Sequence, residues 1–220
     1  MREIILDTET TGLNPSNGDR IVEIGAIEMI DKVLSGNQFH VFINPEREVP
    51  EEAYRIHGLS TEFLSTKQPF RNIVAEFLEF IEGGTLVIHN APFDVGFINY
   101  ELSLLKLPSI KIDEVIDTLS IARKLFPGAR TNLDALCKRF KIDNSMRTNH
   151  TAIVDAKLLA EVYIELTGGR QTSFTIDKKI VKNQFFQVGD RNSTGNKIVI
   201  YPTESESEAH NLLMSKIIGF

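Results

Sequence analysis

The sequence lacks the features of secreted, membrane-spanning and repetitive proteins. It has one cysteine in 220 residues, Cys137, which cannot form an internal disulfide and so indicates a reducing compartment. No run approaches the ~20 apolar residues of a membrane-spanning helix, and the opening MREIILDTET lacks the apolar core of a signal peptide. There is no internal repeat or low-complexity tract. We therefore expect a globular, cytoplasmic protein with no membrane partner.

Basic side chains are also in deficit, with 24 Lys and Arg against 30 Asp and Glu, a net charge of −6 at pH 7. A nucleic-acid partner usually requires a basic surface, so this balance alone argues against one. The deficit is uneven: residues 1–122 carry nine basic and 20 acidic side chains, whereas residues 123–147 carry seven basic and two acidic. That basic stretch is either a solvated helix face or a strip that contacts phosphates, and charge alone favours the first.

Hydrophobic periodicity predicts an α/β domain with a mixed central sheet flanked by helices. Three strand-like runs come first, and their short connections favour antiparallel pairing. Strands and helices then alternate along the chain. The predicted strands are residues 3–7, 20–30, 38–44, 85–89 and 114–118. The predicted helices are residues 70–82, 92–105, 119–126, 132–140 and 151–166.

The polarity and periodicity of the sequence change after Gly169. Residues 170–195 are polar and weakly periodic, whereas residues 205–218 have the spacing of a helix. The apolar side chains of that helix form a stripe from Ala209 to Phe220. We therefore expect a main domain of residues 1–169 followed by a C-terminal segment, residues 170–220, that is either a packed appendage or a linker with a partner-binding tail.

Asp7 and Glu9 lie two residues apart near a predicted strand end, so both carboxylates project from the same face. Two like charges on one face of an apolar strand are costly unless a positive charge lies between them. A divalent cation is the usual partner, and oxygen ligands suit Mg²⁺ or Mn²⁺. The pair therefore predicts a metal site.

Three further side chains could complete such a site. Asp94 lies in the first turn of a predicted helix, where the helix dipole alone also favours an acid. Asp155 points inward if the apolar side of its helix faces the core, and His150 directly precedes that helix. Two-metal phosphodiester hydrolysis uses such a set: cations about 3.5–4 Å apart activate a water and stabilise the leaving 3′ oxygen. A histidine, with a reference pKa of about 6.5, can accept the water's proton.

Three motifs, Leu6–Gly12 (LDTETTG), His89–Asp94 (HNAPFD) and His150 with Asp155, follow one another as in the DEDDh 3′–5′ exonucleases. The sequence resembles this family over about residues 2–169, which implies a ribonuclease-H-like fold. Further stretches resemble those members that proofread for bacterial replicative DNA polymerases. These stretches are residues 56–59, 117–119, 132–137 and 160–163.

The resemblance also implies roles for individual residues. Two divalent cations, Mg²⁺ or Mn²⁺, would be held by Asp7, Glu9, Asp94 and Asp155, and His150 would be the general base. A pocket that reads sugar and backbone and stacks on bases would accept any 3′-terminal nucleotide, and frayed mismatched ends would enter it most easily. Its residues would be Thr8, Glu9, Thr10, Thr11, Gly12, Leu13, His57, Phe93 and Asp155.

We therefore predict a metal-dependent 3′–5′ DNA exonuclease that removes mismatched 3′-terminal nucleotides as the proofreading subunit of a replicative DNA polymerase. It would act on single-stranded or frayed 3′ ends and release nucleoside 5′-monophosphates. An RNA-trimming exonuclease of the same superfamily is one alternative, because the sequence does not fix how the site treats a 2′-hydroxyl. A non-catalytic scaffold is another, but the intact carboxylates and histidine argue against it.

The C-terminal appendage suggests two partners. In the proofreading members this segment binds the polymerase catalytic subunit, and the stripe from Ala209 to Phe220 would suit that role. Gln171–Ile176 (QTSFTI) resembles a sliding-clamp-binding peptide, although it also fits a plain linker. With little basic surface outside residues 123–147, the protein should hold DNA poorly alone and depend on a partner.

Overall fold

The computed structural model describes residues 1–145, 150–168, 205–208 and 210. Contacts divide the chain into two units, Met1–Ser173 and Phe174–Phe220. In the second unit, residues 205–208 and 210 are helical, inside the helix predicted from the sequence. The clamp-like peptide and the whole apolar stripe lie outside the described residues. None of the helices among the described residues is long and apolar enough to span a membrane.

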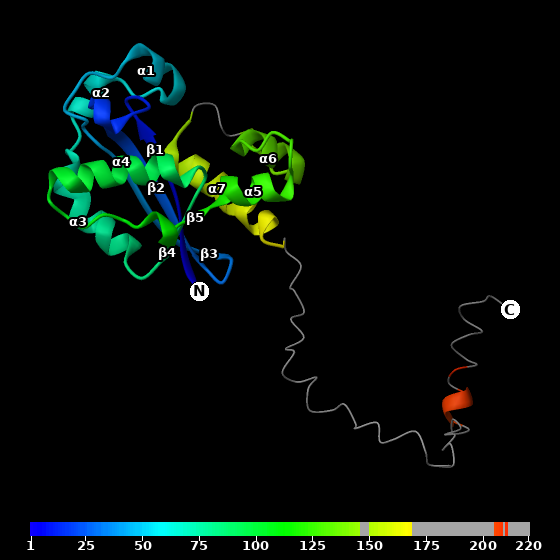
Figure 1. Cartoon of the computed structure of the whole chain (residues 1–220). Helices are drawn as coiled ribbons and strands as arrows, with labels where there is room; N and C mark the ends of the chain where they lie inside the picture. The colour runs from blue at the N-terminus through cyan, green and yellow to red at the C-terminus, as the bar shows by residue number, and fades with distance from the viewer. Residues whose placement is uncertain (146–149, 169–204, 209, 211–220) are drawn as a thin grey trace, which may run out of the picture. The chain divides into compact units, whose positions relative to one another are not determined.

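A five-stranded sheet in the order β3-β2-β1-β4-β5 forms the centre of the first unit (Figure 1). Strands β1 (Arg2–Thr10), β2 (Ile21–Ile30) and β3 (Val33–Phe42) form an antiparallel meander. Strands β4 (Thr85–Ile88) and β5 (Ile116–Asp117) extend the sheet in parallel with β1. The predicted mixed sheet is confirmed.

Three strands differ from their predicted bounds by more than one residue: β1 ends at Thr10, three residues after its predicted end, and β3 and β5 also differ. Strand β3 begins at Val33, five residues before the predicted start, since the left-handed residues Asp31 and Lys32 close a tight hairpin. The first six residues of β3 are exposed, so they show no inward-facing alternation. Strand β5 has only two residues, because a 3₁₀ turn, η2 (Ile112–Glu114), occupies the start of the predicted run.

Helices cover both faces of the sheet, giving three layers (Figure 1). Ile4 and Leu6 of β1 pack with α3 (Phe70–Ile81) and α4 (Ala91–Leu104) on one face. Ile5 packs on the other face with a second group of helices. That group comprises α5 (Thr118–Leu125), α6 (Leu133–Phe140) and α7 (Ala152–Leu166). All five helices lie within one residue of their predicted bounds.

Two short helices, α1 (Glu51–His57) and α2 (Thr61–Ser65), were not predicted. Helix α1 buries only Ala53 and His57, so it has no apolar stripe that periodicity can detect. A left-handed Gly58 ends α1, with a φ of 74°. Together with the 3₁₀ turn η1 (Pro15–Asn17), these elements connect the strands above the end of β1.

Gly25 of β2 allows the start of α7 to approach the sheet closely. A Cβ atom at this position would lie 2.3 Å from the backbone carbon of Ala152 and 2.3 Å from the backbone nitrogen of Ile153. Because Gly25 pairs with Asp7 of β1, this contact places the start of α7 beside the part of β1 that carries Asp7.

We expect Gly25→Ala to lower the free energy of unfolding by about 1–3 kcal/mol, because the backbone of α7 must move away from the added methyl group. Gly96→Ala is the matched control: Gly96 lies inside α4 with no atom within 4 Å of an added Cβ, so alanine should not destabilise the protein. Urea denaturation followed by circular dichroism measures both. Equal midpoints for Gly25→Ala and the wild type would contradict the close-approach argument.

Candidate active site

The four candidate carboxylates and the candidate base line one cavity of about 250 Å³. Strand β1 contributes Asp7 and Glu9, the first turn of α4 contributes Asp94, and the start of α7 contributes His150 and Asp155. Residues far apart in the sequence thus meet where one strand ends and two helices begin. The remaining lining residues are Thr8, His89, Phe93 and Leu133.

Asp7 and Glu9 face α7, as their spacing along β1 requires. Asp7 pairs across the sheet with Gly25, and Glu9 pairs with Glu23. Gly25 contacts the backbone of α7, and partners in an antiparallel pair carry their side chains on the same face. Both carboxylates therefore point to the helix that carries Asp155.

Asp94 is only 3% exposed and is held by Thr8. Its Oδ1 accepts hydrogen bonds from the Thr8 backbone N–H at 3.1 Å and from the Thr8 hydroxyl at 2.7 Å. Burial nevertheless raises the pKa of Asp94 to about 7. Burial thus makes the charged form of Asp94 unfavourable, and a cation bound nearby would stabilise that form.

The start of α4 is fixed by Asp117 at the end of β5. The Oδ1 atom of Asp117 accepts the backbone N–H of Asn90 at 3.0 Å and that of Leu119 at 3.1 Å. Asn90 is left-handed, with a φ of 70°, and turns the chain from β4 into α4. Asp117 thereby links the starts of α4 and α5 and holds the turn that carries Asp94.

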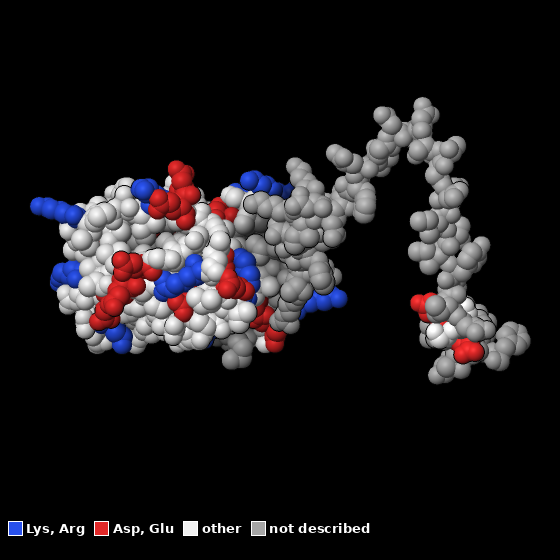
Figure 2. All heavy atoms as spheres, turned by 90° about the horizontal axis from the view of Figure 1, so that it is seen from below, with Lys and Arg blue, Asp and Glu red and all other residues white. Residues whose placement is uncertain are grey.

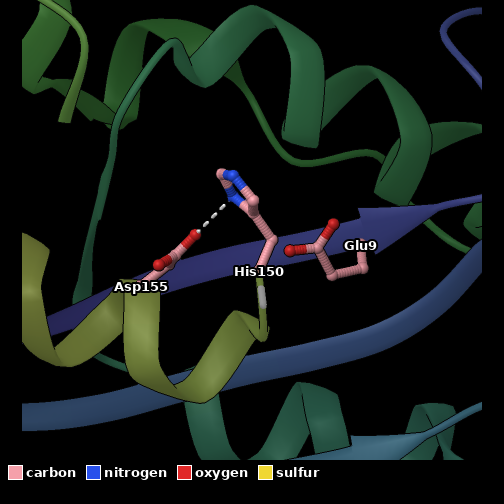
Figure 3. Close-up of side chains that lie close together, drawn as sticks. All are labelled: Glu9, His150 and Asp155. Atoms are coloured by element: carbon pink, nitrogen blue, oxygen red, sulfur yellow. Dashed lines mark hydrogen bonds and ion pairs between the residues drawn. The ribbon is translucent and has the colours of Figure 1, made fainter. Parts of the chain in front are cut away.

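His150 and Asp155 contact each other at the start of α7, with 3.2 Å between His150 Nδ1 and Asp155 Oδ2 (Figure 3). Asp155 is 4% exposed, and its backbone N–H donates to the Thr151 carbonyl at 3.0 Å. The backbone N–H of His150 donates to the Ile56 carbonyl of α1 at 3.3 Å. The imidazole is therefore placed by contacts from both α7 and α1.

The arrangement suits a divalent cation. Glu9, His150 and Asp155 can each place one ligand atom so that all three lie within 4.8 Å of one another. Figure 3 shows these side chains converging from β1 and the start of α7. Asp7 and Asp94 line the same cavity and add carboxylate oxygens, the ligands that hard cations prefer. The buried, costly charge of Asp94 fits the same interpretation.

A second, larger cavity of about 560 Å³ adjoins the first, and we call it the nucleotide groove. The two cavities share Thr8, Glu9 and Phe93. All but one of the predicted nucleotide contacts line the groove, and the exception, Asp155, lines the carboxylate cavity. The groove also contains residues that the sequence did not indicate. They are Asp19, Pro50, Glu52, Ala53 and Ile56, four of them from α1 or directly before it.

Hydrogen bonds fix the loop that follows β1 and forms part of the groove lining. The Thr10 hydroxyl donates to the Gly12 carbonyl at 2.7 Å, and the backbones of Thr11 and Arg20 pair through a 2.9 Å hydrogen bond. The Arg20 guanidinium makes two 2.7 Å hydrogen bonds to Glu101 of α4. Since α4 also carries Phe93 and Asp94, the loop and the carboxylate cavity are joined by a partly buried ion pair. Leu13, 85% exposed, lies at the open side of the groove.

His57 forms the buried end of the groove and is 2% exposed. Its Nδ1 accepts the backbone N–H of Leu59 at 3.0 Å. Burial lowers the pKa of His57, although the charge of Glu23 and the carbonyl of Thr10 oppose this shift. The imidazole is therefore neutral at neutral pH, and its proton lies on Nε2.

His89 and Leu133 of the carboxylate cavity were not predicted as site residues. His89 lies in the second motif, and its Nδ1 is 2.9 Å from the Thr118 hydroxyl. Burial lowers the pKa of His89, and the positive charge of Arg123 adds to this shift, whereas the charge of Asp117 and the backbone of Thr131 oppose it. The motif could have indicated His89, whereas Leu133 has no signal beyond being apolar.

The basic stretch, residues 123–147, begins in α5, whose first residue, Thr118, contacts His89 of the carboxylate cavity. Its described cationic side chains are exposed, and the Arg139 guanidinium lies 4.3 Å from the centre of the Phe126 ring. On the face shown in Figure 2, basic and acidic side chains are interspersed among uncharged ones. A phosphate contact by this stretch stays a prediction.

Residues 4–163 match the family model RNase_T, described as an exonuclease. The DNA polymerase III subunit epsilon of Rickettsia felis is 57% identical over 223 residues, spanning 99% of this chain and 97% of that protein. The subunit of the same name from Escherichia coli strain K12 is 45% identical over 219 residues, spanning 95% and 90%.

Two solved structures share the fold. Exonuclease X, in complex with 5′ overhanging duplex DNA, has 27% identity and a TM-score of 0.59, covering 74% of this chain and 90% of that one. The nuclease domain of 3′hExo, a DEDDh family member bound to rAMP, has 16% identity and a TM-score of 0.66, covering 76% and 91%. The mixed sheet with flanking helices is thus the ribonuclease-H-like fold of these nucleases. The chain belongs to the RNase_T exonuclease family and, within it, to the DNA polymerase III epsilon subunits.

Proposed function

We propose that this chain is the proofreading 3′–5′ exonuclease of a replicative DNA polymerase, working in the cytoplasm. It removes mismatched 3′-terminal nucleotides by hydrolysis and releases nucleoside 5′-monophosphates. One observation supports this most strongly: four carboxylates and a histidine from three elements line one cavity that opens beside the nucleotide groove.

In this proposal Asp7, Glu9, Asp94 and Asp155 hold two divalent cations, Mg²⁺ or Mn²⁺. When bound, the cations lower the pKa of the attacking water and stabilise charge on the leaving 3′ oxygen. His150 is the general base. With Nδ1–H directed to Asp155 Oδ2, its Nε2 carries the lone pair that accepts the water's proton.

The groove holds the 3′-terminal nucleotide. Thr8, Glu9 and Phe93 belong to both cavities, so a nucleotide in the groove places its 5′ phosphate beside the carboxylates. The wall formed by Thr10–Leu13 contacts the sugar and the base face, and Phe93 and His57 flank the ring. Stacking contacts of this kind do not read base edges, as removal of any mismatched nucleotide requires.

The proposed partners are the frayed 3′ end of DNA and the polymerase catalytic subunit. The relatives are named as subunits of DNA polymerase III. We assign the contact with the catalytic subunit to residues 170–220 and a contact with a sliding clamp to Gln171–Ile176. Tethering raises the effective concentration of the nuclease at the primer end, which compensates for weak DNA binding by an acidic protein.

The test compares the purified chain on matched DNA, mismatched DNA and RNA 3′ ends, with Mg²⁺ and with EDTA. We expect metal-dependent release of 5′-monophosphates, faster from mismatched than from matched ends because less pairing must be broken. Faster trimming of RNA would favour the RNA exonuclease, and EDTA-resistant cleavage would exclude the metal mechanism. In a further arm, the chain ending at Gly169 should cleave short single strands normally but fail to co-purify with the polymerase subunit. Unchanged co-purification would refute the tail assignment.

A further inference from the structure

Asp19 is an acidic residue of the nucleotide groove that the proposed function does not use. It lines the groove together with Gly12 and Leu13, and its side chain is 16% exposed. A carboxylate repels the phosphate of a nucleotide, so a contact with that phosphate does not explain Asp19. Its contacts within the protein give a different explanation.

The Asp19 carboxylate packs directly against the backbone of Gly12. A Cβ atom added to Gly12 would lie 2.3 Å from Asp19 Oδ2 and 2.6 Å from Asp19 Oδ1. The carboxylate thus occupies the space that a side chain at position 12 would need. Glycine at this position permits the close approach of Asp19 to the loop that follows β1.

The same carboxylate bonds to the loop on the other side of Leu13. Asp19 Oδ2 accepts the backbone N–H of Asn14 at 3.1 Å. Gly12 and Asn14 are the two neighbours of Leu13, whose exposed side chain lies at the open side of the groove. An exposed side chain gains little from packing, so contacts to the neighbouring backbone determine where Leu13 lies. One carboxylate supplies such a contact on both sides of it.

Arg47 holds the carboxylate in this position from a separate segment, the connection between β3 and α1. Its Nη1 atom donates to Asp19 Oδ1 at 3.0 Å and to the Gly18 carbonyl. Each oxygen of the Asp19 carboxylate therefore has its own donor, which fixes the orientation of the side chain. Ion pairs this accessible contribute little to overall stability, so the effect of this one is mainly local.

We propose that Asp19 is a positioning residue that holds the turn Gly12–Asn14, and with it Leu13, in the orientation that receives the 3′-terminal nucleotide. The inference rests on the proposed function, in which the wall Thr10–Leu13 contacts the sugar and the base face. Asp19 acts through this turn and does not itself bind the substrate. A turn that is ordered before the nucleotide arrives lowers the entropic cost of binding. Loss of Asp19 should therefore weaken substrate binding more than the chemical step.

The experiment measures kcat and KM of the full chain on a single-stranded DNA oligonucleotide with Mg²⁺. We expect Asp19→Ala to raise KM about tenfold with little change in kcat. The matched control is Asp143→Ala, which should leave KM unchanged. Asp143 is exposed and also accepts a backbone N–H, from Ser145 at 2.9 Å, but it lines neither of the two cavities. An unchanged KM in Asp19→Ala, a loss confined to kcat, or an equal rise in the control would each overturn the proposal.

A double variant tests whether Asp19 acts through the turn. In a Leu13→Ala background the side chain that the turn presents is gone, so Asp19→Ala should raise KM by no more than about twofold. The full tenfold rise in that background would show that Asp19 acts independently of Leu13, which would overturn the proposal.

Hydrogen exchange followed by nuclear magnetic resonance gives a readout independent of activity. The Asn14 amide should exchange with solvent faster in Asp19→Ala than in the wild type, and at the wild-type rate in Asp143→Ala. Unchanged exchange in Asp19→Ala would overturn the proposal. If the wild type cleaves no nucleic acid, the proposed function fails, and the exchange comparison alone decides whether Asp19 holds the turn.

A second substitution keeps the test available if Asp19→Ala does not fold. Asp19→Asn retains the volume of the side chain against Gly12 but removes the charge that pairs with Arg47. It should raise KM several-fold while Leu13 is present, and no change in KM would overturn the proposal.

Discussion

Asp155→Asn should lower the rate of 3′ hydrolysis on single-stranded DNA by at least about 10³-fold while leaving the protein folded. The effect is large because Asp155 has two functions. Its carboxylate is a proposed cation ligand, and its Oδ2 contacts His150 Nδ1 at 3.2 Å. Asparagine keeps the volume of this buried side chain but removes the charge, so circular dichroism should show an unchanged fold.

The variant should also bind Mn²⁺ more weakly, which isothermal titration calorimetry measures directly. The control is Glu161→Gln, on the exposed side of the same helix, which should retain the wild-type rate and Mn²⁺ affinity. Near-normal turnover by a folded Asp155→Asn protein would remove this residue from the proposed ligand set.

His150→Gln should lower kcat by about 10²–10⁴-fold, the usual contribution of a general base, with Mn²⁺ binding preserved. Glutamine retains a polar side chain of similar reach but cannot take up a proton near neutral pH. Stopped reactions on a labelled oligonucleotide measure the rate, and calorimetry measures the binding of Mn²⁺.

Two comparisons make this result specific. His210→Gln changes an exposed histidine of the second unit and should leave hydrolysis unaltered. Loss of Mn²⁺ binding in His150→Gln, alongside loss of rate, would instead identify His150 as a ligand, which its distance from Glu9 and Asp155 also permits. A wild-type rate in His150→Gln would exclude His150 as the base.

The sequence identified the candidate site residues because they lie at or near the ends of regular elements. Asp7 and Glu9 lie in the last part of β1, Asp94 lies in the first turn of α4, and His150 directly precedes α7. Periodicity placed the starts of α4 and α7 to within one residue and the end of β1 to within three, and the order of the motifs supplied the rest.

What the sequence did not show depends on contacts between distant segments. Helix α1 is short and mostly exposed, so Ile56 and Ala53 could not be recognised as groove residues. Glu23 is a charged residue of a predicted strand that nothing in the sequence marks as buried, yet it is 0% exposed. The contact between His89 and Thr118 likewise exists only once the end of β4 and the start of α5 are brought together.

The hydrogen bond from the His150 backbone to the Ile56 carbonyl has a consequence for engineering this nuclease. Ile56 also lines the groove. The helix that forms part of the proposed nucleotide site therefore also holds the backbone of His150, the proposed base. A substitution in α1 that widens the groove for a bulkier nucleotide by displacing the Ile56 backbone also weakens the hydrogen bond between the Ile56 carbonyl and the His150 N–H. Substrate range and turnover are therefore coupled through this helix, whereas changes at Leu13, at the open side of the groove, leave the hydrogen bond to His150 in place.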